Sequence, residues 1–243
     1  AATLSGGIMD LPAGELGFAA GYEHRKESAH YTPDSLTSQG LANDPRVEPT
    51  AGEFSVDELY AELAIPLLAD LPLAQQVDLS AAMRYFNYST FGEDTTWKLG
   101  LTWRLYDDLM VRGGRSTAFR APTVGELFGG KSPSFDQVVH PATEQTQAEV
   151  TVGGNPLLTP EEADITTVGL VYSPSYVEGL SFTVDYYDIA ITNTITAVDS
   201  NYVANQCLGA DGSLINTGTA LCQSSNISID NTEFLLCICI SPT

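Results

Sequence analysis

The sequence is poor in positive charge. Its 243 residues hold 10 Lys and Arg against 31 Asp and Glu, which gives a formal net charge of -21. Such a chain repels phosphate backbones, so nucleic acid is excluded as a partner. An acidic balance of this kind is usually a solvated surface, and by itself it assigns no cation site.

Long apolar runs are also missing. No run of about eighteen consecutive apolar residues occurs, which excludes a transmembrane helix. Residues 1–5 lack the basic and apolar regions of a signal peptide, so we expect any export signal to lie outside the sequence. The missing apolar runs do not exclude a membrane β-barrel. In such a barrel, lipid-facing and lumen-facing residues alternate along each strand, so their average hydropathy resembles that of a soluble protein.

The signatures of catalysis are absent as well. The sequence contains no Gly-x-Ser-x-Gly, His-Glu-x-x-His, phosphate loop or dinucleotide fingerprint. His24 and His30 share strand parity, but six residues along a strand separate them by about 20 Å, too far for one metal ion. We therefore predict no enzyme, no cofactor and no metal site.

What the sequence does contain is alternation of apolar and polar residues with a period of two, which is typical of half-buried strands. The clearest case is the stretch in which Trp97, Leu99, Leu101 and Trp103 alternate with polar residues and glycine. Seven segments follow the pattern: residues 16–23, 53–67, 77–85, 97–104, 109–119, 167–172 and 180–187.

The connections between these segments alternate in length. Short connections rich in Asp, Pro or Gly are followed by mostly long ones, at residues 32–52, 124–159 and 196–231. Transmembrane barrels have short turns on one side and long loops on the other. The sequence therefore predicts an all-β antiparallel up-and-down meander, a partial transmembrane β-barrel with about seven strands of a larger barrel. The alternative is a soluble β-sandwich that acts as a carbohydrate-binding module.

Three motifs then occur in order along the chain. The first joins Phe119, Arg120, Ala121 and Pro122 to Glu126, Leu127 and Phe128; the second holds Asn155, Pro156, Pro160 and Glu161; the third is Gly179 to Ile189. Together they resemble the TonB-dependent outer-membrane receptors, over most of residues 8–195. Within the first motif, Arg120 offers a fork of donors that fits either an ion pair at the barrel rim or a lipopolysaccharide phosphate or anionic ligand.

The resemblance implies a barrel of about 22 strands around an N-terminal plug. It also implies the outer membrane of a Gram-negative bacterium, contact with outer-membrane lipid, and active uptake of a small, scarce nutrient such as a siderophore, cobalamin or oligosaccharide. The sequence contains neither the plug nor the box that engages the energising partner. We therefore expect residues 1–232 to be a partial barrel, not competent alone, that would meet the TonB complex only through the missing plug region.

The remaining expectations concern loops and tail. Candidate ligand contacts in the loops are Tyr31, Phe128, Phe135 and Tyr202. Cys207 and Cys222 flank a loop rich in Gly and Asn, and in an oxidising compartment they are predicted to form a disulfide. Residues 233–243 form an atypical apolar tail without alternation, which suggests a truncation or a frame artefact, although a buried strand has the same pattern.

Overall fold

The computed structural model describes all residues except 140–145, 212, 220–221, 223–225, 231–232 and 240–243. Strands dominate these residues, and they divide into two compact units that are treated separately below. The elements in chain order are β1 (Ala2–Leu11), β2 (Gly14–Tyr31), α1 (Ser35–Ser38), β3 (Thr50–Leu71), β4 (Ala74–Tyr88), β5 (Gly92–Tyr106), β6 (Leu109–Arg120), α2 (Val124–Phe128), β7 (Ser132–Val138), β8 (Thr146–Gly153), β9 (Glu161–Tyr172), β10 (Phe182–Thr192), α3 (Ser200–Cys207), β11 (Asn226–Asp230) and β12 (Glu233–Cys239).

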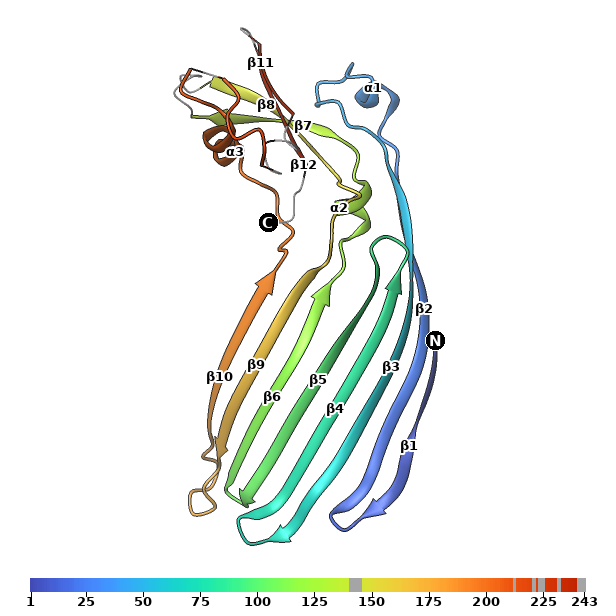
Figure 1. The fold of residues 1–243 in the computed structure, drawn as a ribbon, viewed down its shortest axis with the longest axis vertical. Helices are drawn as coiled ribbons and strands as arrows, with labels where there is room; N and C mark the ends of the chain where they lie inside the picture. The colour runs from blue at the N-terminus through green and yellow to red at the C-terminus, as the bar shows by residue number, and fades with distance from the viewer. Residues whose placement is uncertain (140–145, 212, 220–221, 223–225, 231–232, 240–243) are drawn as a thin grey trace. The chain divides into compact units, whose positions relative to one another are not determined.

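Unit 1 is a single curved sheet (Figure 1). It comprises Ala1–Lys26, Ser55–Arg120 and Glu161–Thr192. Its eight strands follow the order β1-β2-β3-β4-β5-β6-β9-β10, in which chain neighbours are sheet neighbours apart from one excursion between β6 and β9. This confirms the predicted antiparallel meander. The eight strands join one sheet instead of dividing between two, so the β-sandwich alternative is wrong.

The sheet has one strand more than the seven predicted, because β1 was missed. A bulge between Gly7 and Met9 shifts the pairing of β1 with β2, so that Leu4 lies opposite Ala20 whereas Met9 lies opposite Leu16. The bulge moves the apolar side chains of β1 from even to odd positions. A search for a strict period of two therefore fails across it.

Unit 2 comprises Glu27–Phe54, Ala121–Pro160 and Asn193–Thr243. Its four-stranded sheet has the order β11-β12-β8-β7, with β7 and β8 antiparallel and β12 parallel to β8. A small apolar core joins α3 to the β7–β8 hairpin: Val138, Ala148, Val150, Val203, Ala204, Cys207 and Leu208. The long connections were predicted as long loops, and the structure corrects this: they contain three helices and three of these strands.

Cys207 and Cys222 form a disulfide in unit 2, with their Cα atoms 5.5 Å apart. Cys207 is the last residue of α3 and is fully buried in the apolar core, while Cys222 packs against the edge of that core. The bond therefore fixes the segment after α3 to the helix. Among the described residues, no helix is long and apolar enough to cross a membrane.

The short turns at one end of the unit 1 sheet are joined by hydrogen bonds. The Trp103 indole Nε1 on β5 donates to the backbone oxygen of Leu73, in the β3–β4 turn, at 2.8 Å. The Ser173 backbone N, after β9, donates to the backbone oxygen of Asp108, in the β5–β6 turn, also at 2.8 Å. Each of these hairpin ends is thus held to the next one.

Candidate functional site

The pairing of strands separates unit 1 into two faces. Trp97 lies opposite Met83, and Leu99 lies opposite Ala81, so the apolar residues of β4 and β5 share one face, called here the apolar face. Leu99 is 48% exposed, although a soluble protein normally buries such side chains. The opposite side, called here the polar face, carries the charged residues that alternate with these, among them Lys98.

A buried carboxylate lies on the polar face. Glu58 on β3 is only 4% exposed. The Arg84 Nη1 on β4 donates to Glu58 Oε2 at 2.9 Å, and the Arg25 Nη2 on β2 lies 4.0 Å from Glu58 Oε1. A buried carboxylate is costly unless it is paired. Two guanidinium groups therefore hold one carboxylate across three strands, and Arg25 is also paired with Glu23, with Nη1 at 3.4 Å from Glu23 Oε1.

Arg84 has donors that Glu58 does not use. Its guanidinium lies 5.3 Å from the centre of the Tyr60 ring, and its side chain is 47% exposed. Together with Thr96 and Lys98 it lines a hollow of about 210 Å³ in unit 1. A partly exposed guanidinium next to an ammonium group is suited to binding an anion.

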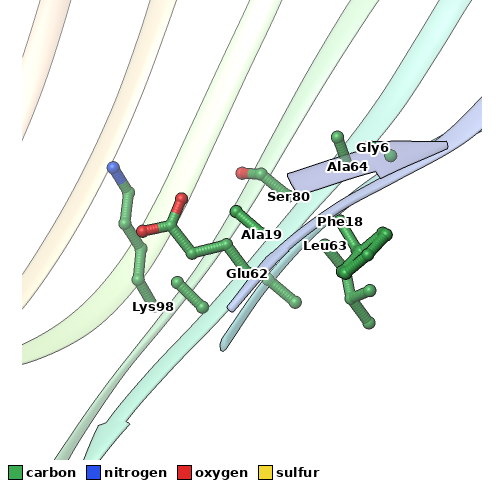
Figure 2. A pocket seen from close by; sticks show the side chains of 11 residues that line it. Gly6, Phe18, Ala19, Glu62, Leu63, Ala64, Ser80 and Lys98 are labelled. Atoms are coloured by element: carbon green, nitrogen blue, oxygen red, sulfur yellow. The ribbon is translucent and has the colours of Figure 1, made fainter. Parts of the chain in front are cut away.

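A larger hollow of about 440 Å³ shares Glu62, Ala82 and Lys98 with the first one. Small residues form much of it: Gly6, Gly17, Ala19, Ala64, Ser80 and Ala82. Figure 2 shows the Glu62 carboxylate and the Lys98 ammonium projecting from the same side of the sheet. Both flank Ala82 in one row of the ladder. The two hollows thus form one continuous polar surface with charges of both signs.

The first motif begins on β6, within unit 1. The Phe119 ring stacks on the fully buried Phe86 with 3.8 Å between ring centres. Arg120 binds Glu161 of β9 with two hydrogen bonds, Nε to Oε2 at 2.8 Å and Nη2 to Oε1 at 2.9 Å. Of the two roles considered for Arg120, the structure contains the ion pair, so this end of the motif holds β6 to β9.

The rest of the first motif lies within unit 2, where its residues cap and pack the N-terminus of α2. Thr123 caps the helix, and its hydroxyl accepts from the Glu126 backbone N at 3.2 Å while the Glu126 carboxylate accepts from the Thr123 backbone N at 2.7 Å. The Asn155 backbone N donates to the Glu126 backbone oxygen at 2.7 Å. Pro122 and Leu127 are buried. The two motifs therefore meet at α2, and their role there is structural.

Gly154 provides a test of this junction. A Cβ at Gly154 would lie 2.5 Å from the Gly129 backbone N and 2.8 Å from the Leu127 backbone carbon, whereas one at Gly125 would meet only the Thr123 hydroxyl at 3.9 Å. We expect Gly154→Ala to destabilise the α2 region by about 1–3 kcal/mol, because backbone has to move. Gly125→Ala is the matched control and leaves it unchanged or more stable. Amide hydrogen exchange in α2 measures both, and equal protection in the two variants contradicts the assignment.

The four aromatic residues predicted as ligand contacts lie in four different elements: β2, α2, β7 and α3. Tyr31, Phe135 and Tyr202 are each at least 55% exposed, at the end of β2, in β7 and in α3. Within the described residues, no ring contact or hydrogen bond joins their side chains. Phe128 lies against Gly52, where an added Cβ would collide with its ring. Phe128 is thus placed for packing.

One carboxyl group in the long connections has a shifted pKa. Hydrogen bonds from the Ser213 hydroxyl at 2.6 Å and from the Ser213 backbone N at 3.0 Å lower the pKa of the Asp211 carboxyl. Asp211 therefore keeps its charge in mildly acidic solution. In the part of the chain that the structure describes, no group of three or more His, Cys, Asp or Glu is arranged to hold a metal ion.

Sequence reasoning missed the Arg25–Glu58–Arg84 cluster. The three residues come from three different strands, and Glu58 and Arg84 are 26 residues apart in the chain. Strand alternation places each of them on the polar face, but only the register of β3 against β4 brings Arg84 opposite Tyr60 and next to Glu58. The sequence feature that could have predicted this cluster is the presence of charged residues at similar positions along successive strands.

An antiparallel meander with one exposed apolar face and one charged face defines the class of β-barrel walls that contact lipid on one side and a lumen on the other. The chain matches the family model described as TonB dependent receptor-like, beta-barrel, over residues 2–230. The chain therefore belongs to the family of TonB-dependent receptor β-barrels. The family consists of Gram-negative outer-membrane receptors, not enzymes, that bind small ligands such as siderophores and interact with TonB.

Solved structures support the same fold. The siderophore receptor PirA from Acinetobacter baumannii is 15% identical, with a TM-score of 0.57 over 99% of this chain and 31% of that chain. PirA from Pseudomonas aeruginosa is 16% identical, with a TM-score of 0.60 over 99% and 36%. A mutant ferric enterobactin receptor, PfeA, from Pseudomonas aeruginosa in complex with enterobactin is 19% identical, with a TM-score of 0.61 over 99% and 30%. The chain thus spans about a third of the length of these receptors. No curated protein matches it.

Proposed function

We propose that the chain forms part of the outer-membrane barrel of a receptor that takes up a scarce nutrient. The observation that carries this proposal is the contrast between the two faces of unit 1. The exposed apolar face is suited to lipid, and the polar face is suited to a water-filled lumen. Uptake and coupling to the TonB complex are proposed for the whole receptor, with coupling through the plug region that accompanies this barrel in the family.

The polar face favours one of the three nutrient classes. Arg84 and Lys98 offer positive charge beside a hollow that Glu62 also lines, while Arg25 is paired with Glu23 and lies near Glu58. Anionic ligands gain most from such a surface, whereas a neutral oligosaccharide would leave the charges unused. We therefore favour an anionic siderophore over cobalamin or an oligosaccharide. One similar solved receptor is a complex with enterobactin, which agrees with this choice.

The domain boundaries are part of the proposal. The family match ends at residue 230, which supports residues 1–232 as receptor barrel with its connections and residues 233–243 as a distinct tail. In the described part of this tail, Glu233–Cys239 forms β12 beside β8. Residues 240–243 lie outside the described residues.

Binding of ferric enterobactin to the detergent-solubilised full chain tests the ligand class. We expect Arg84→Gln to weaken binding about tenfold, since a hydrogen bond to a charged group contributes about 1.5–3 kcal/mol. Arg104→Gln is the control: it removes the same charge from the polar face, on β5 instead of β4 and in a row next to the short turns, where Arg104 lies opposite Gln76 and Met110. No binding by the unmodified chain, or equal loss in both variants, would rule out this site.

A further inference from the structure

The charges of the cluster on the polar face balance one another. Arg25 and Arg84 carry two positive charges. Glu23 and Glu58, which pair with them, carry two negative charges. An anion that binds Arg84 therefore approaches the Glu58 carboxylate, whose Oε2 accepts from Arg84 Nη1 at 2.9 Å. Because like charges repel at short distance, anion binding at Arg84 requires that another group balance the charge of Glu58.

The two carboxylates of the cluster differ in their access to water. Glu58 is buried, whereas the side chain of Glu23 is 37% exposed. Leaving a buried carboxylate without a partner destabilises a protein strongly, while an exposed ion pair contributes little to stability. Glu58 therefore has to keep a guanidinium partner. Glu23 can exchange its partner for water at small cost.

Arg25 lies within reach of both carboxylates. Its Nη1 donates to Glu23 Oε1 at 3.4 Å, and its Nη2 lies 4.0 Å from Glu58 Oε1. The second distance is longer than that of a hydrogen bond, so Arg25 is near Glu58 without being bonded to it. Arg84 binds the other oxygen of this carboxylate, Oε2. A shift of about 1 Å would therefore give Glu58 a hydrogen bond from Arg25, at the oxygen that Arg84 does not use.

The Tyr60 ring gives Arg84 a second contact, which is independent of Glu58. The Arg84 guanidinium lies 5.3 Å from the centre of this ring, within the range of a cation–π interaction. The ring itself is fixed by two neighbouring strands. Its hydroxyl lies 2.7 Å from the Thr3 hydroxyl on β1, and a Cβ added to Gly21 on β2 would lie 2.5 Å from the same hydroxyl. Arg84 thus keeps a contact beside the hollow when it leaves Glu58.

We propose that Arg25 is a positioning residue that frees Arg84 to bind an anionic ligand. The ligand first binds the Arg84 donors that Glu58 does not use. Arg84 then stays on the Tyr60 ring and gives up its bond to Glu58, while Arg25 moves onto Glu58 and Glu23 becomes hydrated. The ligand thereby replaces the exposed Glu23 carboxylate in the charge balance, and the buried Glu58 is never left unpaired. This exchange of partners rests on the proposed function, because it needs the anion site at Arg84.

Binding of ferric enterobactin to the detergent-solubilised full chain tests the exchange. We expect Arg25→Gln to weaken binding about tenfold, as Arg84→Gln does, because Glu58 then keeps Arg84. The variant with both substitutions should bind no more weakly than Arg84→Gln alone, since the two residues act in one step. If Arg25 only attracted the ligand from a distance, the two losses would add. Arg104→Gln is again the control and should leave binding unchanged.

Two further measurements separate this role of Arg25 from a structural one. Without ligand, Arg25→Gln should leave the melting temperature unchanged, because Arg84 still pairs with Glu58. A neutral Gln at position 58 needs no charged partner, so Glu58→Gln should restore full binding in the Arg25→Gln variant. Unchanged binding in Arg25→Gln, additive losses, a lowered melting temperature or a failure of this rescue overturns the exchange. Failure of the unmodified chain to bind, or full binding by Arg84→Gln, would instead refute the anion site of the proposed function, and the exchange with it.

Discussion

Purified in buffer without detergent, the chain is expected to sediment almost completely, and in a micellar detergent it is expected to stay in solution. The apolar face explains the difference. Leu99 and Val168 are 48% and 52% exposed there, and they continue in rows across neighbouring strands. A soluble monomer rarely exposes such a continuous apolar surface. Water should therefore drive copies of the chain together, while detergent covers the same surface.

The edges of the sheet strengthen this expectation. β1 and β10 are the outermost strands of unit 1, and each has one side without a partner strand in that sheet. β10 has neither proline nor a basic residue to discourage pairing with another chain. The net charge of -21 slows association but satisfies no backbone hydrogen bond. The chain should therefore aggregate in buffer at ordinary protein concentrations.

A matched pair of variants on β5 tests which face is responsible. Leu101→Lys places a charge on the apolar face, and Thr102→Lys places it on the polar face one residue later. A lysine on a lipid-facing surface costs about 2–4 kcal/mol at the membrane centre, so Leu101→Lys should weaken association with micelles and Thr102→Lys should not. Analytical ultracentrifugation with and without detergent measures both effects. A stable monomer of the unmodified chain in plain buffer would contradict the barrel assignment.

Loss of the disulfide is expected to have the second large effect. Cys222→Ala breaks the bond and leaves Cys207 in its buried position at the end of α3. The sequence separation is 15 residues, and closing such a loop stabilises a fold by about 3 kcal/mol in the chain-entropy model. The region around α3 should therefore open more often. Limited proteolysis after α3 measures this, because cleavage follows the population of the open form.

Reduction of the unmodified chain with a thiol is the control for this experiment, because it removes the bond without changing any residue. It should raise the cleavage rate as much as Cys222→Ala does. Unit 1 serves as an internal reference, since neither treatment touches a residue in it. An unchanged cleavage rate after reduction would show that the core around Val203 and Leu208 holds the segment without the bond.

Much of unit 1 was predictable because each strand carries its own evidence. The alternation from Leu16 onward and from Val77 onward marks β2 and β4 without knowledge of any neighbour. β1 was not predicted because its bulge interrupts the alternation of apolar and polar residues. The β7–β8 hairpin escaped for a different reason. Its strands are short and lie between glycines and prolines that predict turns, and their burial depends on α3, far away in the chain.

The site was less predictable than the fold. Alternation assigns Arg84 to a face, but its partner Glu58 is found only through the register of two strands. The ligand contacts expected at Tyr31 and Phe135 stay predictions, because the exposure of the two side chains does not by itself define a binding site. The motif around Arg120 was recognisable from its residue order, but its ion pair with Glu161 and its hydrogen bond to Asn155 were not predictable from that order.

The hydrogen bonds between hairpin ends bear on how such a sheet can change over generations. Trp103 and Leu73, like Ser173 and Asp108, fix successive hairpins at the end with short turns. An insertion in a short turn would have to break the hydrogen bonds to the next hairpin. An insertion in a long connection disturbs only that connection. Exchange of a long connection for one from another receptor should accordingly preserve the strand register. New ligand preferences can then arise from changed long connections while the strands of the barrel stay the same.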